Sequence, residues 1–314
     1  MKPLVSILIP CYNAQKWIAQ AIESALNQTY PYKEVIVVDD GSTDGSLEII
    51  QSFGDRIIHE TGINCGGNAA RNRLLELSSG EWLQYLDADD YLLPNKIAQQ
   101  IQYLEELDTD IIYSPSIFQY HTGEKVTQEI LPIPQPHDTW ILLTRWYLPQ
   151  TGSPLWRKQA IIDVGGWKVE QLCCQEHELY LRLLIAQKRF CYYEEAASVY
   201  RQWSESTVCK KSITETYRRR LEVVDKTEQH LIITKQLTQS RQNAINQARF
   251  ECARIIWLTN KEWAKTIVKQ IRNRELNFVP SGDCAPEIYR LMYKFFGFDF
   301  AEKTAQFKRN LVAS

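Results

Sequence analysis

Two carboxylates separated by one residue, in Asp87-Ala88-Asp89, are the side chains in this sequence whose type and spacing most clearly indicate a chemical role. Side chains alternate in direction along an extended segment, so both carboxylates are predicted to lie on one side and to meet one cation. Mg²⁺ and Mn²⁺ favour oxygen ligands and commonly combine one or two carboxylates with the phosphates of a substrate. The pattern therefore predicts a divalent metal site for a phosphate-bearing substrate, with a solvated acidic loop as the alternative.

A second acidic pair, Asp39-Asp40, follows the apolar run Val35–Val38 in the same way. Carboxylates that open into a crevice need partners, such as a base N–H or a sugar hydroxyl. The alternative is that one of them caps the helix that follows. We expect one aspartate to bind ligand and the other to be free for capping.

Arg71 lies in the first turn of a predicted helix, directly after the glycine-bearing turn of residues 64–68. A guanidinium there can fork onto a base carbonyl or a phosphate, and the alternative is an arginine on the helix surface. Neither GxxxxGK[ST] nor GxGxxG follows any predicted strand, so the sequence does not predict a phosphate loop or a dinucleotide fold.

The segment Gln175-Glu176-His177-Glu178 supplies a candidate general base. A carboxylate at a helix start beside an acceptor pocket can take a hydroxyl proton, which predicts this role for Glu176. HExxH spacing is absent, so His177 is not predicted to hold a metal. Glu178 and Arg182 are spaced i, i+4 and are predicted to form an ion pair on the helix surface.

The elements that must position these residues alternate between strands and helices. Short apolar, β-branched runs predict buried strands at residues 4–10 and 35–38. A weak pattern predicts a strand at 57–58, and further strands are predicted at 81–86 and 111–113. Helices are predicted at residues 44–52, 69–77 and 94–107, and Asn13 is predicted to cap a helix that ends near residue 26. This order predicts a doubly wound, mostly parallel sheet that binds ligands at the carboxyl ends of its strands.

The second half of the chain is less regular. Residues 123–138 are rich in proline and polar residues and are predicted to be a loop-like, mobile border. Helices are predicted at 140–147 and 176–186, and short strands at 190–193 and 197–203. From about residue 212 the pattern becomes helical, with charged residues between Leu, Ile and Trp.

Composition bounds the class of protein. The 314 residues are 44% hydrophobic and 24% charged with a net charge of −2, which is typical of a globular protein without a nucleic-acid partner. The eight cysteines form no CxxC pair and the N-terminus does not read as a signal peptide, so we expect reduced thiols and a cytoplasmic location, at the inner face of the membrane if a membrane is contacted. No run of about eighteen apolar residues predicts a membrane span.

Together these motifs resemble the family 2 glycosyltransferases of the GT-A fold, over roughly residues 4–205. The resemblance rests on five motifs in the family's order: Val5–Asn13, Ser24–Thr29, Val37–Asp44, Gly67–Asn72 and Leu86–Asp90.

The resemblance implies roles for individual residues. Pro10, Tyr12 and Asp39 would contact the nucleotide base, and Arg71 would assist them. Asp87 and Asp89 would hold ribose, diphosphate and a divalent metal, Mn²⁺ or Mg²⁺, with Asp90 sharing this work.

The second half of the chain departs from the family at two positions. Glu176 stands where the family usually has an aspartate that acts as catalytic base. The glutamate side chain is one methylene longer than that aspartate, which shifts the carboxylate. Trp203 stands where relatives often have a histidine, so Arg201 is left as the candidate for the diphosphate, and a third protein ligand to the metal is in doubt.

The function that the resemblance implies is metal-dependent, inverting transfer of a sugar from a nucleoside diphosphate sugar to an acceptor hydroxyl. UDP-sugar is the expected donor, with GDP- and dTDP-sugars open, and the acceptor is a glycan, a lipid-linked molecule or another hydroxyl compound. The alternatives are a binding module that has lost catalysis and a phosphohydrolase with Asp87 as nucleophile.

Three parts of the chain follow from this interpretation: a nucleotide-sugar-binding half at 1–115, an acceptor-binding half at 116–210 and a helical extension at 211–314. The acceptor is expected between residues 152–153, 165–167 and 123–138, where Trp156 and Trp167 would either stack on sugar or pack in the core. The helical extension is expected to pack on the rest of the chain, with a homodimer contact or peripheral membrane contact as alternatives.

Overall fold

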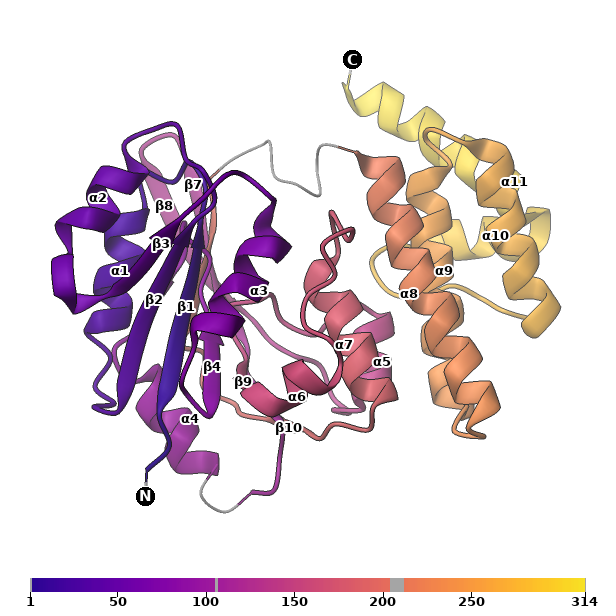
Figure 1. Ribbon diagram of the computed structural model, residues 1–314. Helices are drawn as coiled ribbons and strands as arrows, with labels where there is room; N and C mark the ends of the chain where they lie inside the picture. The colour runs from indigo at the N-terminus through magenta and orange to yellow at the C-terminus, as the bar shows by residue number, and fades with distance from the viewer. Residues whose placement is uncertain (1, 105–106, 204–211, 314) are drawn as a thin grey trace. The chain divides into compact units, whose positions relative to one another are not determined.

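The computed structural model describes residues 2–104, 107–203 and 212–313 (Figure 1). The chain divides into two compact units, residues 1–207 and residues 208–314. The first unit contains every residue to which the sequence analysis assigned a chemical role.

The first unit is built on a seven-stranded sheet in the order β10-β6-β9-β4-β1-β2-β3. Its strands are β1 Val5–Cys11, β2 Lys33–Asp39, β3 Ile58–Thr61, β4 Trp82–Tyr85, β6 Ile111–Tyr113, β9 Leu155–Arg157 and β10 Phe190–Tyr192. Only β9 runs antiparallel to its neighbours, β4 and β6. The predicted mostly parallel sheet is therefore confirmed.

Helices cover both faces of this sheet (Figure 1). They are α1 Ile18–Leu26, α2 Ser46–Ser52, the 3-10 turn η1 Gly54–Arg56, α3 Gly67–Leu77, α4 Lys96–Leu104, α5 Thr139–Thr144, α6 Lys158–Asp163 and α7 Gln175–Ile185. Val5, Ile7 and Ile9 point to the face on which α1, α2 and α4 pack, in one continuous core. Leu8 and Ile36 point the other way because side chains alternate along a strand, and α3 contacts that side.

The capping role predicted for Asn13 is wrong. α1 begins at Ile18 after Trp17, without a side-chain cap. Asn13 has a left-handed φ of 49°. Its side-chain oxygen accepts a hydrogen bond from the backbone N–H of Thr43, 2.8 Å away. A residue of this type can satisfy backbone groups elsewhere as readily as in its own helix, so Asn13 ties the loop after β1 to the loop after β2.

A second sheet of four strands has the order β5-β11-β7-β8. Its strands are β5 Tyr91–Leu92, β7 Ser116–Thr122, β8 Lys125–Leu131 and β11 Ser198–Gln202. The prediction of a loop over 123–138 is wrong in its first half, since β8 pairs antiparallel with β7. Every residue of β8 is exposed, so this edge strand lacks the alternating apolar pattern by which strands are predicted.

Trp156 and Trp167 belong to the core, so the stacking role offered for them as one alternative is wrong. Their side chains are 0% and 2% exposed. Trp156 stacks on Tyr180, with ring centroids 5.1 Å apart, and Trp167 meets Tyr85 edge-on at 5.2 Å. Neither indole has a face open to a sugar.

The second unit consists of helices, which confirms the predicted helical extension. They are α8 Ile213–Ile233, α9 Gln239–Ile256, α10 Lys261–Arg274 and α11 Glu287–Ala313. Ser212, Thr238 and Asn260 each accept a hydrogen bond from the backbone N–H three residues later, which fixes the start of α8, α9 and α10. A core around Phe250 holds α9, α10 and α11 together. In the described part of the chain no helix is long and apolar enough to span a membrane.

Candidate active site

The carboxyl ends of β1, β2 and β4 lie side by side and gather the candidate donor residues. Cys11 pairs with Asp39 across β1 and β2, and the backbone N–H of Leu86 bonds the carbonyl of Leu8 across β4 and β1. Pro10, Asp39 and Asp87 therefore lie at or just after the carboxyl ends of three neighbouring strands. Tyr12, just beyond β1, is 52% exposed and leaves its ring open to a ligand.

The two aspartates after β2 have different partners. Asp39 accepts hydrogen bonds from the backbone N–H of Ser42 at 3.3 Å and from the Thr61 hydroxyl at 2.8 Å. Asp40 accepts from the backbone N–H groups of Cys65 and Gly66, at 2.8 and 2.9 Å. These N–H groups precede α3, so Asp40 fixes the entry to that helix and not to α2, the next helix along the chain.

Residues 87–90 form a turn and not the predicted extended segment. The backbone N–H of Asp90 bonds the carbonyl of Asp87, 3.0 Å away, which turns the chain into β5. Burial and the neighbouring Asp87 raise the pKa of Asp89, so the two carboxylates still repel each other. Asp90 points into the protein instead: it is 2% exposed, and burial raises its pKa well above the ordinary value.

Arg71 is buried, so the alternative of a surface arginine is wrong. Its guanidinium donates to Asp87 Oδ1 at 2.8 Å and to Gln175 Oε1 at 2.9 Å. It also lies over the Trp167 ring, 5.0 Å from the centroid. One side chain therefore joins the turn after β4 to the first residue of α7.

β11 holds the Asp89 segment from the other side. Arg201 is buried, and its guanidinium donates to the backbone carbonyl of Asp89 at 2.6 Å and to Gln20 Oε1 at 2.5 Å. The indole N–H of Trp203 donates to Asp89 Oδ2 at 2.9 Å. The Arg201 guanidinium is thus hydrogen-bonded to protein atoms, and the role predicted for Arg201 at the diphosphate stays a prediction. The end of this motif, residues 204–206, lies outside the described residues.

Glu176 begins α7 next to Gln175 and is 24% exposed. Burial alone would raise the pKa of Glu176, but His177, the backbone and the charge of Arg71 outweigh this effect and lower it below 4.5. His177 Nδ1 lies 3.7 Å from Glu176 Oε1, and its ring stacks on Trp146. Glu176 is therefore ionised at neutral pH, as a general base must be.

The ion pair predicted between Glu178 and Arg182 forms, with nitrogen and oxygen 2.8 Å apart. It is not on the surface, because Glu178 is 5% exposed and also meets Lys168.

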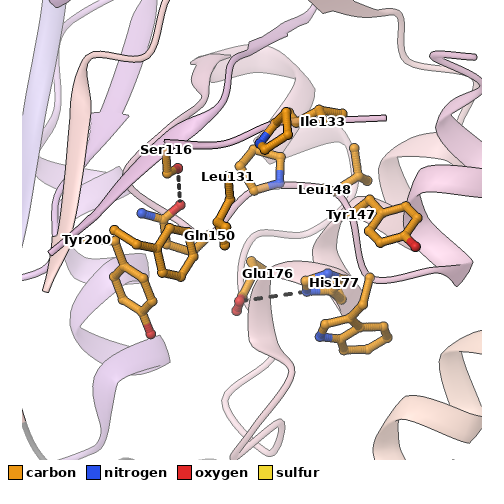
Figure 2. A pocket seen from close by; sticks show the side chains of 13 residues that line it. Ser116, Leu131, Ile133, Tyr147, Leu148, Gln150, Glu176, His177 and Tyr200 are labelled. Carbon is orange, nitrogen blue, oxygen red and sulfur yellow. Dashed lines mark hydrogen bonds and ion pairs between the residues drawn. The ribbon is translucent and has the colours of Figure 1, made fainter. Parts of the chain in front are cut away.

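A cavity of about 390 Å³ opens beside Glu176 (Figure 2). Its other walls come from β7, the end of β8, the segment after α5, and β11. With Glu176, the residues that line the cavity are Ser116, Phe118, Leu131, Pro132, Ile133, Trp146, Tyr147, Leu148, Pro149, Gln150, His177 and Tyr200. Of the expected acceptor segments only 123–138 contributes, through residues 131–133; residues 152–153 and 165–167 do not line it.

Sequence reasoning missed Gln175 and most of this cavity wall. The one sequence signal for Gln175 is its position beside Glu176. The aromatic lining gave no signal, because its members are scattered over residues 118–200 and only the fold collects them.

Asp87 and Asp89 suit a divalent cation by the chemistry of their donor atoms. One carboxylate oxygen of each accepts a hydrogen bond from a protein partner, Arg71 for Asp87 and Trp203 for Asp89, and the second oxygen remains for an ion. Their mutual repulsion is what a cation between them would relieve. Within the described residues no cluster of three His, Cys, Asp or Glu side chains forms a complete metal cage, so substrate oxygens or water would supply the remaining ligands.

None of the seven cysteines in the described residues forms a disulfide, and Cys209 lies outside them. No described disulfide therefore constrains the site.

Curated proteins match about a third of this chain. Glycosyltransferase GlyG of Streptococcus pneumoniae is 37% identical over 118 residues, which are 36% of this chain and 38% of GlyG. WfaP of Escherichia coli, named UDP-Glc:alpha-D-GlcNAc-diphosphoundecaprenol beta-1,3-glucosyltransferase, is 42% identical over 113 residues, 35% of this chain and 45% of WfaP. The match spans less than half the length of either relative.

Solved structures share the fold at low identity. TarS 1-349 of S. aureus, crystallised in complex with UDP-GlcNAc, has a TM-score of 0.61 and 16% identity, over 96% of this chain and 91% of that one. The mannosyltransferase PcManGT from Pyrobaculum calidifontis, in complex with GDP-Man and Mn2+, has a TM-score of 0.52 and 15% identity, over 99% and 88%.

The sequence profile described as glycosyl transferase family 2 matches residues 6–161, which include β1, β2, α3 and the turn with Asp87 and Asp89. With this match and the relatives above, the chain belongs to the family 2 glycosyltransferases and has the GT-A fold.

Proposed function

We propose that this protein transfers a sugar from a nucleoside diphosphate sugar to an acceptor hydroxyl, with inversion at the anomeric carbon. The observation that carries the proposal is the bridge made by Arg71, which joins Asp87 to the first residue of the helix that bears Glu176. A donor diphosphate at Asp87 and a base at Glu176 would then be held in fixed relation, which is what a displacement between two bound reactants needs.

The nucleotide would lie across the carboxyl ends of β1, β2 and β4. Tyr12 offers an exposed ring beside the base, and Asp39 offers a carboxylate already oriented by Ser42 and Thr61. Pro10 would shape the floor between them. UDP is the proposed nucleotide, since WfaP is named for UDP-Glc and TarS was crystallised with UDP-GlcNAc. GDP stays open, because PcManGT was crystallised with GDP-Man.

Asp87 and Asp89 would hold Mn²⁺ or Mg²⁺ at the diphosphate. The ion supplies positive charge that stabilises the departing nucleoside diphosphate. Trp203 orients the Asp89 side chain through its indole N–H, and Arg201 orients the Asp89 backbone. Both residues then act through Asp89 and not on the sugar.

Glu176 would accept the proton of the acceptor hydroxyl as the oxygen attacks the anomeric carbon. The new carbon–oxygen bond forms on the face opposite the bond to the diphosphate. That bond breaks, and the nucleoside diphosphate leaves with its electron pair. The lowered pKa of Glu176 keeps the carboxylate ready at neutral pH. A single displacement of this kind inverts the configuration at the anomeric carbon.

The acceptor would enter the cavity beside Glu176. Phe118 and, labelled in Figure 2, Tyr147 and Tyr200 present rings suited to the apolar faces of sugars. The hydrogen-bonded pair Ser116 and Gln150 presents polar groups to hydroxyls. WfaP is named for an acceptor sugar on diphosphoundecaprenol. A lipid-linked glycan in bacterial polysaccharide synthesis is therefore the proposed acceptor class.

The direct test is release of UDP from UDP-Glc and UDP-GlcNAc in the presence of Mn²⁺, with an extract of lipid-linked glycans as acceptor. We expect wild-type protein to release UDP, Asp89→Ala to lose nucleotide binding, and Glu176→Gln to bind UDP without turnover. Glu170→Gln is the matched control, because Glu170 is an exposed glutamate outside the cavity.

Two outcomes would favour the alternatives. Metal-dependent hydrolysis of simple phosphate esters, lost in Asp87→Asn, would indicate a phosphohydrolase. Tight UDP binding without donor turnover under any condition would indicate a binding module that has lost catalysis.

A further inference from the structure

The two parts of the chain carry opposite charge. Residues 212–314 contain 18 Lys or Arg and 11 Asp or Glu, a net charge of +7, whereas residues 1–211 contain 18 and 27, a net charge of −9. The overall charge of −2 conceals this difference. A basic helical unit of this size is suited to an anionic partner.

α11 exposes large aromatic side chains around a bend. Gly297 has φ 83° and ψ 179°, a conformation that side chains larger than hydrogen rarely adopt, and the helix changes direction there. Phe298 is buried in the core, whereas Phe295, Phe296 and Phe300 are 71%, 66% and 47% exposed. The rings of Phe296 and Phe300 lie 4.8 Å apart, so the exposed rings form a patch and not isolated residues.

A basic pocket of about 370 Å³ borders this patch. It is lined by Lys265, Val268, Lys269, Arg272, Phe296, Gly297, Phe298 and Asp299. The three cations lie on one side of α10 because they are spaced four and three residues apart, while Ala264, Ile267 and Ile271 face the core. Lys265 is paired with Glu262 and Asp299, at 2.8 and 3.4 Å.

Lys269 and Arg272 remain to meet an anion in this pocket. Arg272 lies over the Tyr293 ring, and a Cβ added at Gly297 would come within 3.7 Å of its Nη2 atom. The guanidinium therefore lies beside the bend in α11, where both residues line the pocket. No ion pair to a carboxylate forms at Lys269 or Arg272 within the described residues.

We propose that this surface of the second unit binds an anionic phospholipid bilayer, with a lipid phosphate in the pocket at Lys269 and Arg272 and with Phe296 and Phe300 among the acyl chains. Rings beside a basic pocket match the boundary between acyl chains and phosphate groups. A second copy of this chain fits less well, because it would bring two basic surfaces together. The proposal does not depend on the glycosyl transfer proposed above.

Co-sedimentation of the full-length protein with vesicles tests this directly. We expect binding to vesicles of phosphatidylcholine with phosphatidylglycerol, little binding to vesicles of phosphatidylcholine alone, and weaker binding as salt increases. Lys269→Gln combined with Arg272→Gln should lower the partition coefficient about 30-fold, since each basic residue near an anionic surface contributes a factor of about five.

Matched controls separate the surface from general charge and apolarity. Lys226→Gln with Lys235→Gln removes two exposed cations outside the pocket, and Ile233→Ser removes an apolar side chain that is 71% exposed. These variants should bind vesicles within about threefold of wild type, whereas Phe296→Ser with Phe300→Ser should lose at least tenfold. Circular dichroism melting confirms that each variant is folded.

Other outcomes would overturn the proposal. Equal binding to neutral and anionic vesicles would remove the role of the basic pocket. Loss of a dimer mass in light scattering for Phe296→Ser with Phe300→Ser, without loss of vesicle binding, would assign the patch to a second copy. UDP binding by wild-type protein tests the first unit separately, so failure of one proposal is distinguishable from failure of the other.

Discussion

At the residue scale, Glu176 makes the most specific prediction. Glu176→Gln keeps the size and removes the base, so kcat should fall about 10²- to 10⁴-fold while the Kd for UDP is unchanged. Glu176→Asp keeps a carboxylate and should retain more activity than Glu176→Gln. Steady-state kinetics with calorimetric UDP binding would check this, and equal activity in wild type and Glu176→Gln would exclude Glu176 as the base.

The pH dependence of activity follows from the same residue. Glu176 accepts a proton only when ionised, so activity falls as the pH drops through its pKa. Because that pKa is lowered below 4.5 by His177, the backbone and Arg71, which outweigh burial, kcat should be level above about pH 5.5. A pH–rate profile of the folded protein checks this, and an acidic limb centred near pH 7 would assign the proton to another group.

Trp203 is predicted to position Asp89 for the metal. Trp203→Phe removes the indole N–H at Asp89 Oδ2 and keeps an aromatic ring against Trp17. Loss of a partner that orients a metal ligand typically weakens metal affinity 10- to 100-fold, so we expect at least a tenfold weaker Kd for Mn²⁺. Electron paramagnetic resonance of free Mn²⁺ measures this. Trp263→Phe, in the second unit, serves as the control and should leave the Kd unchanged.

At the element scale, Asp40 joins β2 to the start of α3. Asp40→Ala leaves two backbone N–H groups without their acceptor, which should cost about 1–3 kcal/mol and lower Tm by roughly 3–10 °C. Asp40→Asn keeps one acceptor oxygen and should lose less. Calorimetric melting of both variants checks the prediction, and an unchanged Tm in Asp40→Ala would contradict it.

Much of the fold could be predicted from the sequence because buried parallel strands consist of continuous apolar runs. β1 and β2 follow Leu4–Pro10 and Val35–Val38 closely, and the acidic pair Asp39-Asp40 does stand at the carboxyl end of β2. β8 could not be predicted in this way, because every one of its residues is exposed and no run of apolar residues marks a buried face.

The residue types of the candidate site could be predicted from the sequence, but the contacts between those residues could not. Arg71, Asp87 and Glu176 were chosen for their chemistry, but Arg71 and Gln175 are 104 residues apart and only the fold brings them together. Burial was the other unknown, since a pattern of residues does not show that Trp156 is enclosed or that the chain turns at Ala88.

At the scale of the whole molecule, the candidate donor site is contained in one unit. All candidate donor residues lie between Pro10 and Trp203, within residues 1–207. A chain that ends at residue 207 should therefore bind UDP with a Kd within about threefold of the full-length value, by calorimetry. A loss of UDP binding in a folded truncated chain would mean that the second unit contributes to the site.

Metal-dependent nucleotide binding at Asp87 and Asp89 is the central claim, and a thermal-shift screen tests it most directly. UDP, GDP and dTDP would each be added to wild type and to Asp89→Ala, with and without Mn²⁺. A ligand at 100 times its Kd stabilises the folded state by about 2.7 kcal/mol, so UDP with Mn²⁺ should raise the wild-type Tm by several degrees. We expect no such rise without Mn²⁺ or in Asp89→Ala; a wild-type Tm that no nucleotide moves, with Mn²⁺ present, would contradict the claim.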